Sequence, residues 1–365
     1  MMPYHSHPMN LPLPIQGRGT AGNPANRFEP IEFAPDPEQF DLPEEDRPSP
    51  QTQFLSDASR TVIAFNESPD IGFNASLNPY RGCEHGCIYC YARPTHEYFG
   101  LSAGLDFETK IFVKQNAPEL LRQEMAKLNW KPQLVSISGV TDPYQPIERK
   151  TRLVRRCLEV FLDFRNPIGI ITKNHNVTRD ADLLAELANF HAAVVFISVT
   201  TLDATLTAKL EPRTSSPNRR LAAIETLARA GVPVGALIAP VIPGLTDHEL
   251  PAILQAVANA GATFAGYTPL RLPGAVAPLF EQWLIHHFPD RKDKILNRIR
   301  SIRGGKLNDP NFNTRMQGQG EFADGIANLF AVGCRKAGII GTMPRTSIEH
   351  FRVPVGKGGQ WGLFD

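Results

Sequence analysis

Cysteine is scarce in this chain, with only five among 365 residues, so a fold held together by disulfide bonds is not expected. The sequence has no apolar run long enough to span a bilayer, and no charged-then-apolar secretory leader at its start. A strong charge of one sign is also lacking, because the formal net charge is +1 at pH 7. Together these absences predict a cytoplasmic protein in a reducing compartment.

The first 50 residues differ in composition from the rest of the chain. They hold 11 of the 32 prolines, and eight acidic against three basic side chains, so the total of +1 leaves +6 on the other 315 residues. Apolar positions are few and irregular there, and such a segment cannot offset its ordering entropy by burial. Residues 1–55 are therefore predicted to form a proline-rich N-terminal tail that is disordered or draped over the rest of the chain.

Three of the five cysteines lie close together, as Cys83, Cys87 and Cys90, with the spacing C-x3-C-x2-C. Three thiolates at this spacing can hold three irons of a cubane 4Fe-4S cluster and leave the fourth iron without a protein ligand, whereas a ferredoxin run supplies four cysteines. Gly82 and Gly86 suit a loop that wraps closely around an inorganic core. The stretch therefore predicts a 4Fe-4S cluster with one iron open to chemistry.

Two other interpretations of the cysteines stay open. A zinc site would need four ligands, and only one C-x2-C pair is present, with His85 as the remaining candidate ligand in a tight loop. A closed cluster in a non-catalytic electron-transfer or partner-binding protein would need a fourth protein ligand, which the sequence does not obviously supply.

From residue 56 to residue 272 the chain alternates short apolar strands with amphipathic helices, which is typical of a parallel sheet with right-handed crossovers. Extended pieces are expected at 61–65 and 71–80, and strands at 133–138, 168–173, 192–200, 232–239 and 263–270. Helices are expected at 113–128, 151–164, 179–188, 217–230 and 247–260. Six strands predict an α/β fold, a partial (βα)6 TIM-like barrel, whose strand ends converge on one mouth. Residues 273–365 are expected to form a mostly helical C-terminal extension that covers the barrel, with helices at 276–288, 291–303 and 322–337.

Polar residues follow several of these strands and are candidates for binding a cofactor at the mouth. Thr141 and Asp142 could accept an ammonium group, or form only an Asp-Pro turn. Lys173 could meet a carboxylate, or be a solvated loop lysine. Ser198 and Thr200 could bond a ribose. Arg213 could pair charge with the cofactor or with Glu211. Tyr89 could pack on adenine or only shield the cluster.

The three-cysteine stretch resembles the signature of the radical S-adenosylmethionine (SAM) superfamily. This resemblance implies that the open iron chelates SAM, and that electron transfer from the cluster splits SAM to a 5′-deoxyadenosyl radical that abstracts hydrogen from a substrate. It also implies an external one-electron reductant such as flavodoxin or ferredoxin as a partner.

Within this superfamily, residues 60–270 look like the spore photoproduct lyase-related branch. The resemblance rests on residues 78–83, 141–142, 172–173, 198–200, 211–212, 219–224 and 230–231. It implies that Cys83, Cys87 and Cys90 ligate the cluster. It also implies that Thr141, Asp142, Lys173 and Ser198 contact SAM. In that lyase the radical abstracts hydrogen from a thymine dimer in DNA, and a cysteine beside the Thr/Ser-Asp turn returns a hydrogen atom.

This chain departs from the lyase at the hydrogen donor, because the turn at 138–142 contains no cysteine. Cys157 and Cys334 are predicted to be small core residues rather than donors. Reversal of a thymine dimer is therefore not expected, unless a tyrosine such as Tyr91, Tyr98 or Tyr144 substitutes for the cysteine.

Nucleic acid is the first guess for the substrate. Seven basic side chains lie in residues 290–306 and five in residues 149–156, and such groups can neutralise phosphates when they line one groove. Because the net charge is modest, we favour solvated helix faces for both groups.

Overall fold

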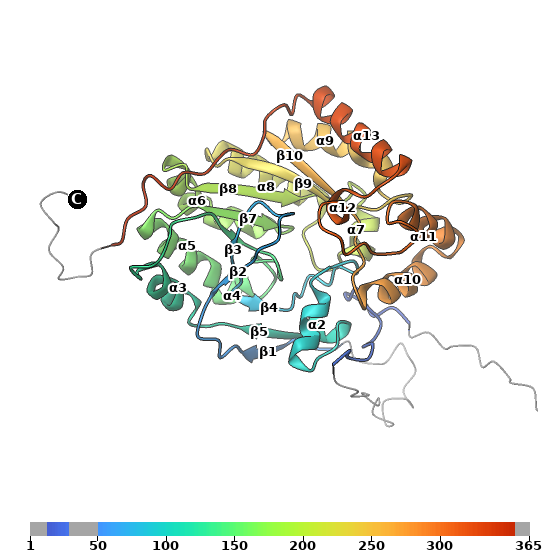
Figure 1. The fold of residues 1–365 in the computed structure, drawn as a ribbon, viewed down its shortest axis with the longest axis horizontal. Helices are drawn as coiled ribbons and strands as arrows, with labels where there is room; N and C mark the ends of the chain where they lie inside the picture. Colours follow the sequence, from blue (N-terminus) through green and yellow to red (C-terminus); the bar gives the residue numbers. More distant parts are fainter. Residues whose placement is uncertain (1–12, 29–49, 355–365) are drawn as a thin grey trace, which may run out of the picture.

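The protein is described here by a computed structural model, which covers residues 13–28 and 50–354. Its centre is a seven-stranded sheet in the order β10-β9-β8-β7-β6-β3-β2 (Figure 1). All pairs from β3 to β10 are parallel, and only the edge strand β2 is antiparallel. The strands are β2 Ile63–Phe65, β3 Ala75–Leu77, β6 Val135–Ile137, β7 Ile168–Thr172, β8 Ala193–Ser198, β9 Val234–Val241 and β10 Phe264–Pro269.

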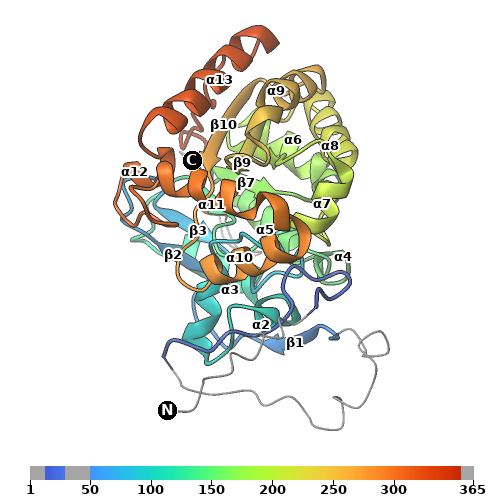
Figure 2. The same ribbon diagram turned by 90° about the vertical axis from the view of Figure 1, so that its right-hand side faces the viewer.

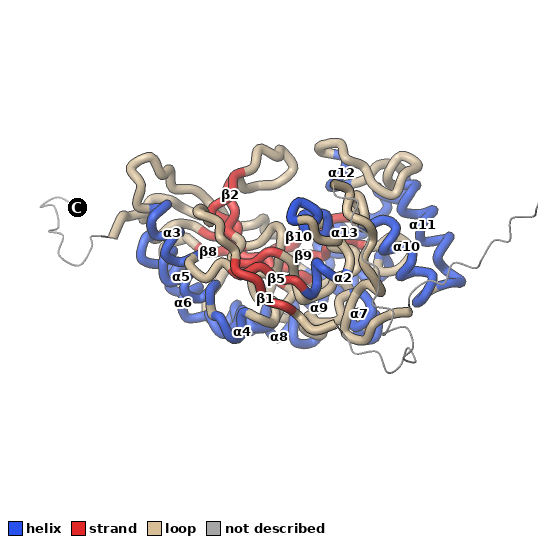
Figure 3. The backbone as a smooth tube through the Cα atoms, turned by 90° about the horizontal axis from the view of Figure 1, so that it is seen from below, coloured by secondary structure: helices blue, strands red, loops and turns tan. Residues whose placement is uncertain are grey.

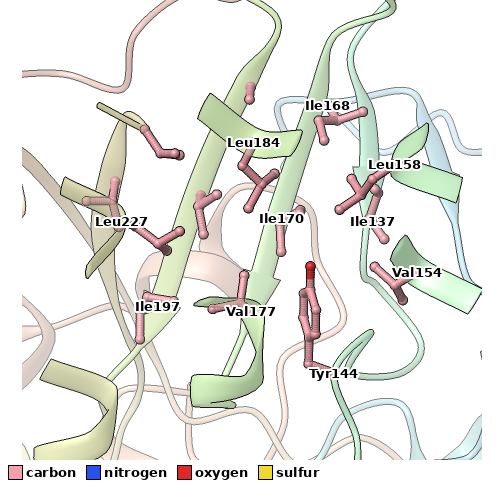
Figure 4. Close-up of a cluster of buried hydrophobic side chains, with 14 of the residues drawn as sticks. Ile137, Tyr144, Val154, Leu158, Ile168, Ile170, Val177, Leu184, Ile197 and Leu227 are labelled. Carbon is pink, nitrogen blue, oxygen red and sulfur yellow. The ribbon is translucent and has the colours of Figure 1, made fainter. Parts of the chain in front are cut away.

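The helices that connect the parallel strands lie together on one side of the sheet (Figure 3). They are α3 Ala117–Met125, α5 Leu153–Phe164, α6 Ala181–Asn189, α8 Pro217–Arg229 and α9 Leu250–Asn259. Their apolar faces meet the strands in one continuous core, where Leu158 and Leu184 approach Ile168 and Ile170 (Figure 4). Six parallel strands with helical crossovers confirm the expected partial (βα)6 barrel.

A second, three-stranded sheet was not predicted from the sequence. Its strands are β1 Gln53–Ser56, β5 Lys110–Val113 and β4 Tyr80–Arg81, in the order β1-β5-β4. The helix expected at 113–128 therefore begins only at Ala117, because residues 110–113 pair with β1 and β4. Short helices complete this region and the loops: η2 Arg93–Phe99, α2 Leu105–Thr109, α4 Glu148–Thr151, η3 His175–Asp180, α7 Ala204–Leu210 and η4 Asp247–Glu249.

The C-terminal part is mostly helical, as expected. It contains α10 Val276–His287, η5 Pro289–Arg291, α11 Lys292–Ser301, α12 Thr314–Gln317 and α13 Glu321–Ala337. Helices α10 and α11 form a second apolar core with Ile88 and Tyr89, beside the cysteines. Helix α13 packs on α9, and the ring of Phe330 lies 4.6 Å from that of Tyr267. Residues 355–365 lie outside the described part, and the domain boundary expected at residue 272 stays a prediction.

Part of the expected N-terminal tail is ordered and makes specific contacts. The backbone N–H groups of Gly19 and Thr20 donate to the buried carboxylate of Glu108, at 2.9 and 3.1 Å. Strand β1 crosses the boundary expected at residue 55. Residues 13–28 and 50–55 therefore lie against the rest of the protein rather than apart from it, because a buried acceptor compensates for their low apolar content. Residues 1–12 and 29–49 lie outside the described part.

Over the two described ranges of the chain, none of the helices has both the length and the apolar composition that crossing a membrane would require.

Candidate active site

The cysteines lie on a tight loop that follows β4. Cys83 N–H donates to the carbonyl of Phe107 at 2.9 Å, and Cys90 N–H donates to that of Cys87 at 3.2 Å. Gly82 and Gly86 have φ of +77° and +66°, which other residues rarely adopt. A Cβ on Gly86 would also lie 2.7 Å from a carboxylate oxygen of Glu108, so this position requires glycine for space as well as for conformation.

All three thiols are free, and each interacts electrostatically with its neighbours. Burial raises the pKa of Cys87 and Cys90, and nearby charges, including the thiolate of Cys83, raise it further. Three thiolates on one loop, two of them buried and one half-buried, are unfavourable by themselves, whereas bound iron would compensate their charge. The loop therefore supplies the three sulfur donors that the predicted cluster would need.

His85, the remaining ligand for the zinc alternative, is occupied elsewhere. Its side chain is 1% exposed, with Nδ1 3.4 Å from Asp142 Oδ2 and Nε2 3.1 Å from Asn174 Nδ2. With both ring nitrogens engaged, His85 has no lone pair directed to a metal. No three His, Cys, Asp or Glu side chains form a group that could hold a single metal ion in the part of the chain that the structure covers.

The Thr141-Asp142 turn after β6 ties the cysteine loop to the sheet. Thr141 Oγ1 donates to the carbonyl of Gly82 at 2.7 Å. Asp142 accepts from Thr172 Oγ1 at 2.7 Å and from Lys173 N–H at 2.8 Å. Burial opposes ionisation of Asp142, but His85 and these hydrogen bonds lower its pKa to about 2. Both predicted residues lie at the mouth, and in this structure their side chains position the loop.

Lys173, at the end of β7, reaches the region of the thiols. Its Nζ donates to the carbonyl of Ala239 at 3.3 Å and lies 5.9 Å from the centroid of the Tyr89 ring. Burial lowers the pKa of Lys173, although the thiolates of Cys87 and Cys90 favour the charged form. This ammonium group is therefore placed to bind an anion beside the cysteines.

Tyr89, Ser198 and Thr200 gather at the end of β8 around a buried ion pair. Tyr89 OH donates to Glu211, and Thr200 Oγ1 donates to the same carboxylate at 2.8 Å. Arg220 pairs with Glu211 and donates to the carbonyl of Ser198 at 3.1 Å. The structure thus brings these three predicted residues together, with the hydroxyls of Tyr89 and Thr200 already engaged.

Arg213 does not join this group. Its guanidinium pairs with Glu84 at 3.1 Å and donates to Thr52 Oγ1 at 3.3 Å. It lines a cavity that none of the other predicted site residues lines. The prediction that Arg213 belongs to the cofactor site with the others is therefore not met, because Glu84 and the N-terminal part of the chain hold its side chain elsewhere.

Sequence reasoning missed a buried ion pair that supports the loop. Arg93 and Glu108 are both 0% exposed and lie 2.6 Å apart. Arg93 also donates to the carbonyls of Cys87 and Gly86 at 3.0 and 3.2 Å. Arg93 follows the cysteines directly, but its partner 15 residues later carries no recognisable signal in the sequence.

Arg271, just beyond β10, was also missed. Its guanidinium lies 6.0 Å from the centroid of the Tyr91 ring, and Tyr91 OH donates to the carbonyl of Gly139 at 2.7 Å. Its Nε is buried and has no hydrogen-bond partner within residues 13–28 and 50–354. Burial lowers the pKa of Arg271, and Arg315 lowers it further. A buried donor of this kind at the mouth suits a carboxylate or phosphate oxygen.

We expect the stability of the fold to depend on pH through His96, which lies beneath the cysteine loop. The side chain is 0% exposed and its Nε2 lies 2.9 Å from the carbonyl of Lys110. Burial lowers the pKa of His96 to about 4. Because an unfolded histidine titrates near pH 6.5, only the unfolded state takes up a proton between pH 6.5 and 4. The stabilisation is therefore complete above this range and lost as the pH falls.

Urea unfolding of the metal-free protein should show this decrease in the free energy of unfolding. From pH 7 to pH 5, His96 is expected to lower the free energy of unfolding by roughly 2 kcal/mol. Between pH 7 and pH 5 the free energy of unfolding of the variant His96→Leu should decrease less than that of the unchanged protein, whatever the absolute stability of the variant. An equal loss in both proteins would contradict this role of His96.

Comparison with known proteins agrees with this geometry. Residues 77–257 match the Radical SAM superfamily. The uncharacterized protein Rv2578c of Mycobacterium tuberculosis is 34% identical over 255 residues, 68% of this chain and 74% of the relative. An uncharacterized protein of Methanocaldococcus jannaschii is 32% identical over 173 residues, 47% of this chain and 62% of the relative.

Solved structures of spore photoproduct lyase share the fold. One, complexed with dinucleoside spore photoproduct, has a TM-score of 0.56 at 17% identity and covers 78% of this chain and 79% of its own. A mutant of the lyase with bound AdoMet and dinucleoside spore photoproduct also has a TM-score of 0.56, at 16% identity and 78% coverage of both chains. The fold and the family match agree with the three-cysteine loop, and the chain belongs to the radical SAM superfamily.

Proposed function

We propose that this protein is a radical SAM enzyme that acts on nucleic acid or a related phosphorylated substrate. The observation that carries the proposal is the loop of three free thiols, held at the mouth of a (βα)6 barrel with no fourth ligand among residues 13–28 and 50–354. When bound and reduced, the cluster with SAM supplies a 5′-deoxyadenosyl radical for hydrogen abstraction. Cys83, Cys87 and Cys90 would hold the cluster.

The chain's own residues would bind SAM beside that cluster. Lys173 is placed to meet the carboxylate of SAM, because its ammonium group lies next to the thiols. Asp142 stays ionised and fixes the backbone of Lys173, so it orients this lysine. Ser198 and Thr200 lie at the adjacent strand end, where hydroxyl groups suit a ribose.

Arg271 supports an anionic substrate. Its unpartnered Nε lies at the open end of the barrel beside Tyr91. The lyase of similar fold has been solved with a dinucleoside, which makes nucleic acid the first candidate. A flavodoxin- or ferredoxin-like donor in the cytoplasm is the proposed source of electrons.

The two basic groups noted in the sequence give this substrate little support. On α11 and beyond, Arg303 is 3% exposed and donates to the carbonyl of Leu270. Arg298 lies 3.6 Å from Asp247. In the second group, Arg155 and Arg156 pair with Asp182 and Glu119. These four arginines thus have partners within the protein, whereas the sequence favoured solvated helix faces for both groups.

The missing donor cysteine makes simple dimer reversal an unsuitable proposal. Cys157 is 0% exposed in the core, and Cys334 lies on α13. Of the three tyrosines considered, Tyr144 is fully buried and bonds Asp180, and Tyr98 packs against Phe28. Tyr91 is 55% exposed, and of these three tyrosines it alone is adjacent in sequence to a proposed cysteine ligand, Cys90. We therefore propose Tyr91 as the residue that faces the substrate radical.

The test is anaerobic reconstitution with iron and sulfide, reduction with dithionite, and detection of 5′-deoxyadenosine from SAM. Candidate oligonucleotides incubated in deuterated buffer would then reveal the substrate by a change in fragment mass. A reconstituted 4Fe-4S protein that never cleaves SAM would overturn the proposed function. An EPR spectrum that added SAM does not alter would favour the electron-transfer alternative.

Lys173→Met is expected to weaken SAM binding by roughly tenfold or more, because a charge-assisted bond beside the cluster is lost. The iron content should stay unchanged, since Lys173 is not a ligand. Anaerobic equilibrium dialysis with labelled SAM measures the affinity. Lys127→Met is the matched control, because Lys127 is exposed beyond the end of α3. Equal affinities of the two variants would contradict the assignment of Lys173.

A further inference from the structure

Strand β1 lies below helix α4 in Figure 2. A cavity is lined by Glu84 of the cysteine loop, by the start of α4 and by two N-terminal pieces of the chain, within residues 16–18 and 51–54. Its volume is about 540 Å³. Cavities that hold small molecules measure roughly 300–1,000 Å³. No residue of the proposed SAM site lines it, so its use requires a separate explanation.

Among the described residues that line this cavity, three are cationic, Arg18, Lys150 and Arg213, and one is an acid, Glu84. The acid is already engaged, because it pairs with Arg213 at 3.1 Å and accepts from the N–H of Ile147 at 2.8 Å. Lys150 is exposed on the short helix α4. The cavity wall therefore carries more positive charge than its own acid compensates.

The two arginines come together at one neutral group. Arg18 Nη2 and Arg213 Nη1 both donate to Thr52 Oγ1, at 3.2 and 3.3 Å. The other hydrogen bonds of Arg18 go to the backbone carbonyls of Glu108 and Pro50. Burial lowers the pKa of Arg18, and the neighbouring charge of Arg213 lowers it further. Two guanidinium groups held this close favour an anion between them.

An aromatic ring completes the wall. Phe54, on β1, lines the cavity and is 46% exposed, so its ring is accessible from the cavity. An exposed ring beside a cationic group offers a stacking surface for a planar heterocycle whose phosphate reaches the cations. Gln16 and Gln51 add amide groups that can read polar edges of such a ring.

We propose that this cavity binds an organic phosphate of mononucleotide size. Arg18, Lys150 and Arg213 hold the phosphate, and Phe54 stacks on the planar ring. The forked guanidinium groups suit two phosphate oxygens, and the lysine adds a point charge. None of the proposed cluster ligands or SAM-binding residues lines this site.

The test is calorimetric titration of the reconstituted full chain, saturated with SAM, with uridine 5′-monophosphate as the probe. Uridine and inorganic phosphate, each of which supplies half of the contacts, should bind at least roughly tenfold more weakly. Lys150→Gln and Phe54→Ala should each weaken binding by about tenfold. Lys127→Gln and Phe65→Ala are matched controls, because both residues are exposed away from the cavity, Phe65 by 66%.

Three results would overturn the proposal. The first is no binding of uridine 5′-monophosphate at about 1 mM, and the second is equal binding of uridine. The third is a loss of binding in Arg271→Gln while Lys150→Gln binds normally, which would place the phosphate in the barrel mouth. Lys150 and Phe54 are sufficiently exposed that their variants should fold, and circular dichroism checks this.

Discussion

Replacing any one of Cys83, Cys87 and Cys90 by serine should abolish the cleavage of SAM, a loss expected to exceed about a thousandfold. Each thiolate would hold one iron corner of the proposed cluster, and two thiolates would not retain a cubane with a defined open iron. The brown visible absorption and the iron content of the reconstituted protein should fall together with the formation of 5′-deoxyadenosine.

The two other cysteines provide matched controls for the same substitution chemistry. Cys334→Ser changes a half-buried thiol on α13 and should leave both iron content and SAM cleavage intact. Cys157→Ala removes a fully buried side chain of α5, so it should lower the stability of the fold by about 1–2 kcal/mol without loss of iron per folded chain. Full iron loading of the Cys90→Ser protein would contradict the assignment of the ligands.

The parts of the fold that could be predicted from the sequence depend on local patterns. Each parallel strand is a short apolar run, and each crossover helix has a regular apolar face, so β6 to β10 and their helices were expected close to where they lie. The cysteine spacing is local as well, since three ligands fall within eight residues. The family match confirms the superfamily that the cysteine spacing resembles, and the ligand roles of the three cysteines stay a prediction.

The parts that could not be predicted depend on contacts between distant residues. Composition marks residues 13–28 as a tail, but a carboxylate 89 residues further along the chain orders Gly19. Arg213 lies just beyond α7, and Glu84 and Thr52 hold its side chain on another wall. Arg271 belongs to no recognisable sequence motif. It is identified as a candidate site residue only by its buried Nε, which has no hydrogen-bond partner among the described residues.

The second large effect is expected from Glu108→Ala. This carboxylate is the ion-pair partner of the fully buried Arg93, and it also accepts from Gly19 N–H, Thr20 N–H and Thr20 Oγ1. Removing it leaves a buried guanidinium without its counter-ion and two backbone donors without an acceptor. Loss of one partner of a buried pair lowers the free energy of unfolding by about 3–5 kcal/mol. Urea unfolding of the metal-free protein measures this loss.

Asp163→Ala is the control, because the pair of Asp163 with Arg122 is about half exposed on both sides and should contribute no more than about 1 kcal/mol.

The consequences of Glu108→Ala should also reach the cysteine loop and the N-terminal segment. Arg93 holds the carbonyls of Gly86 and Cys87, so iron retention should fall in the variant. Trypsin should cut faster after Arg18, since Gly19 and Thr20 lose their anchor. If Glu108→Ala has the same free energy of unfolding and the same rate of tryptic cleavage as Asp163→Ala, the Arg93–Glu108 ion pair does not stabilise the cysteine loop and the N-terminal segment.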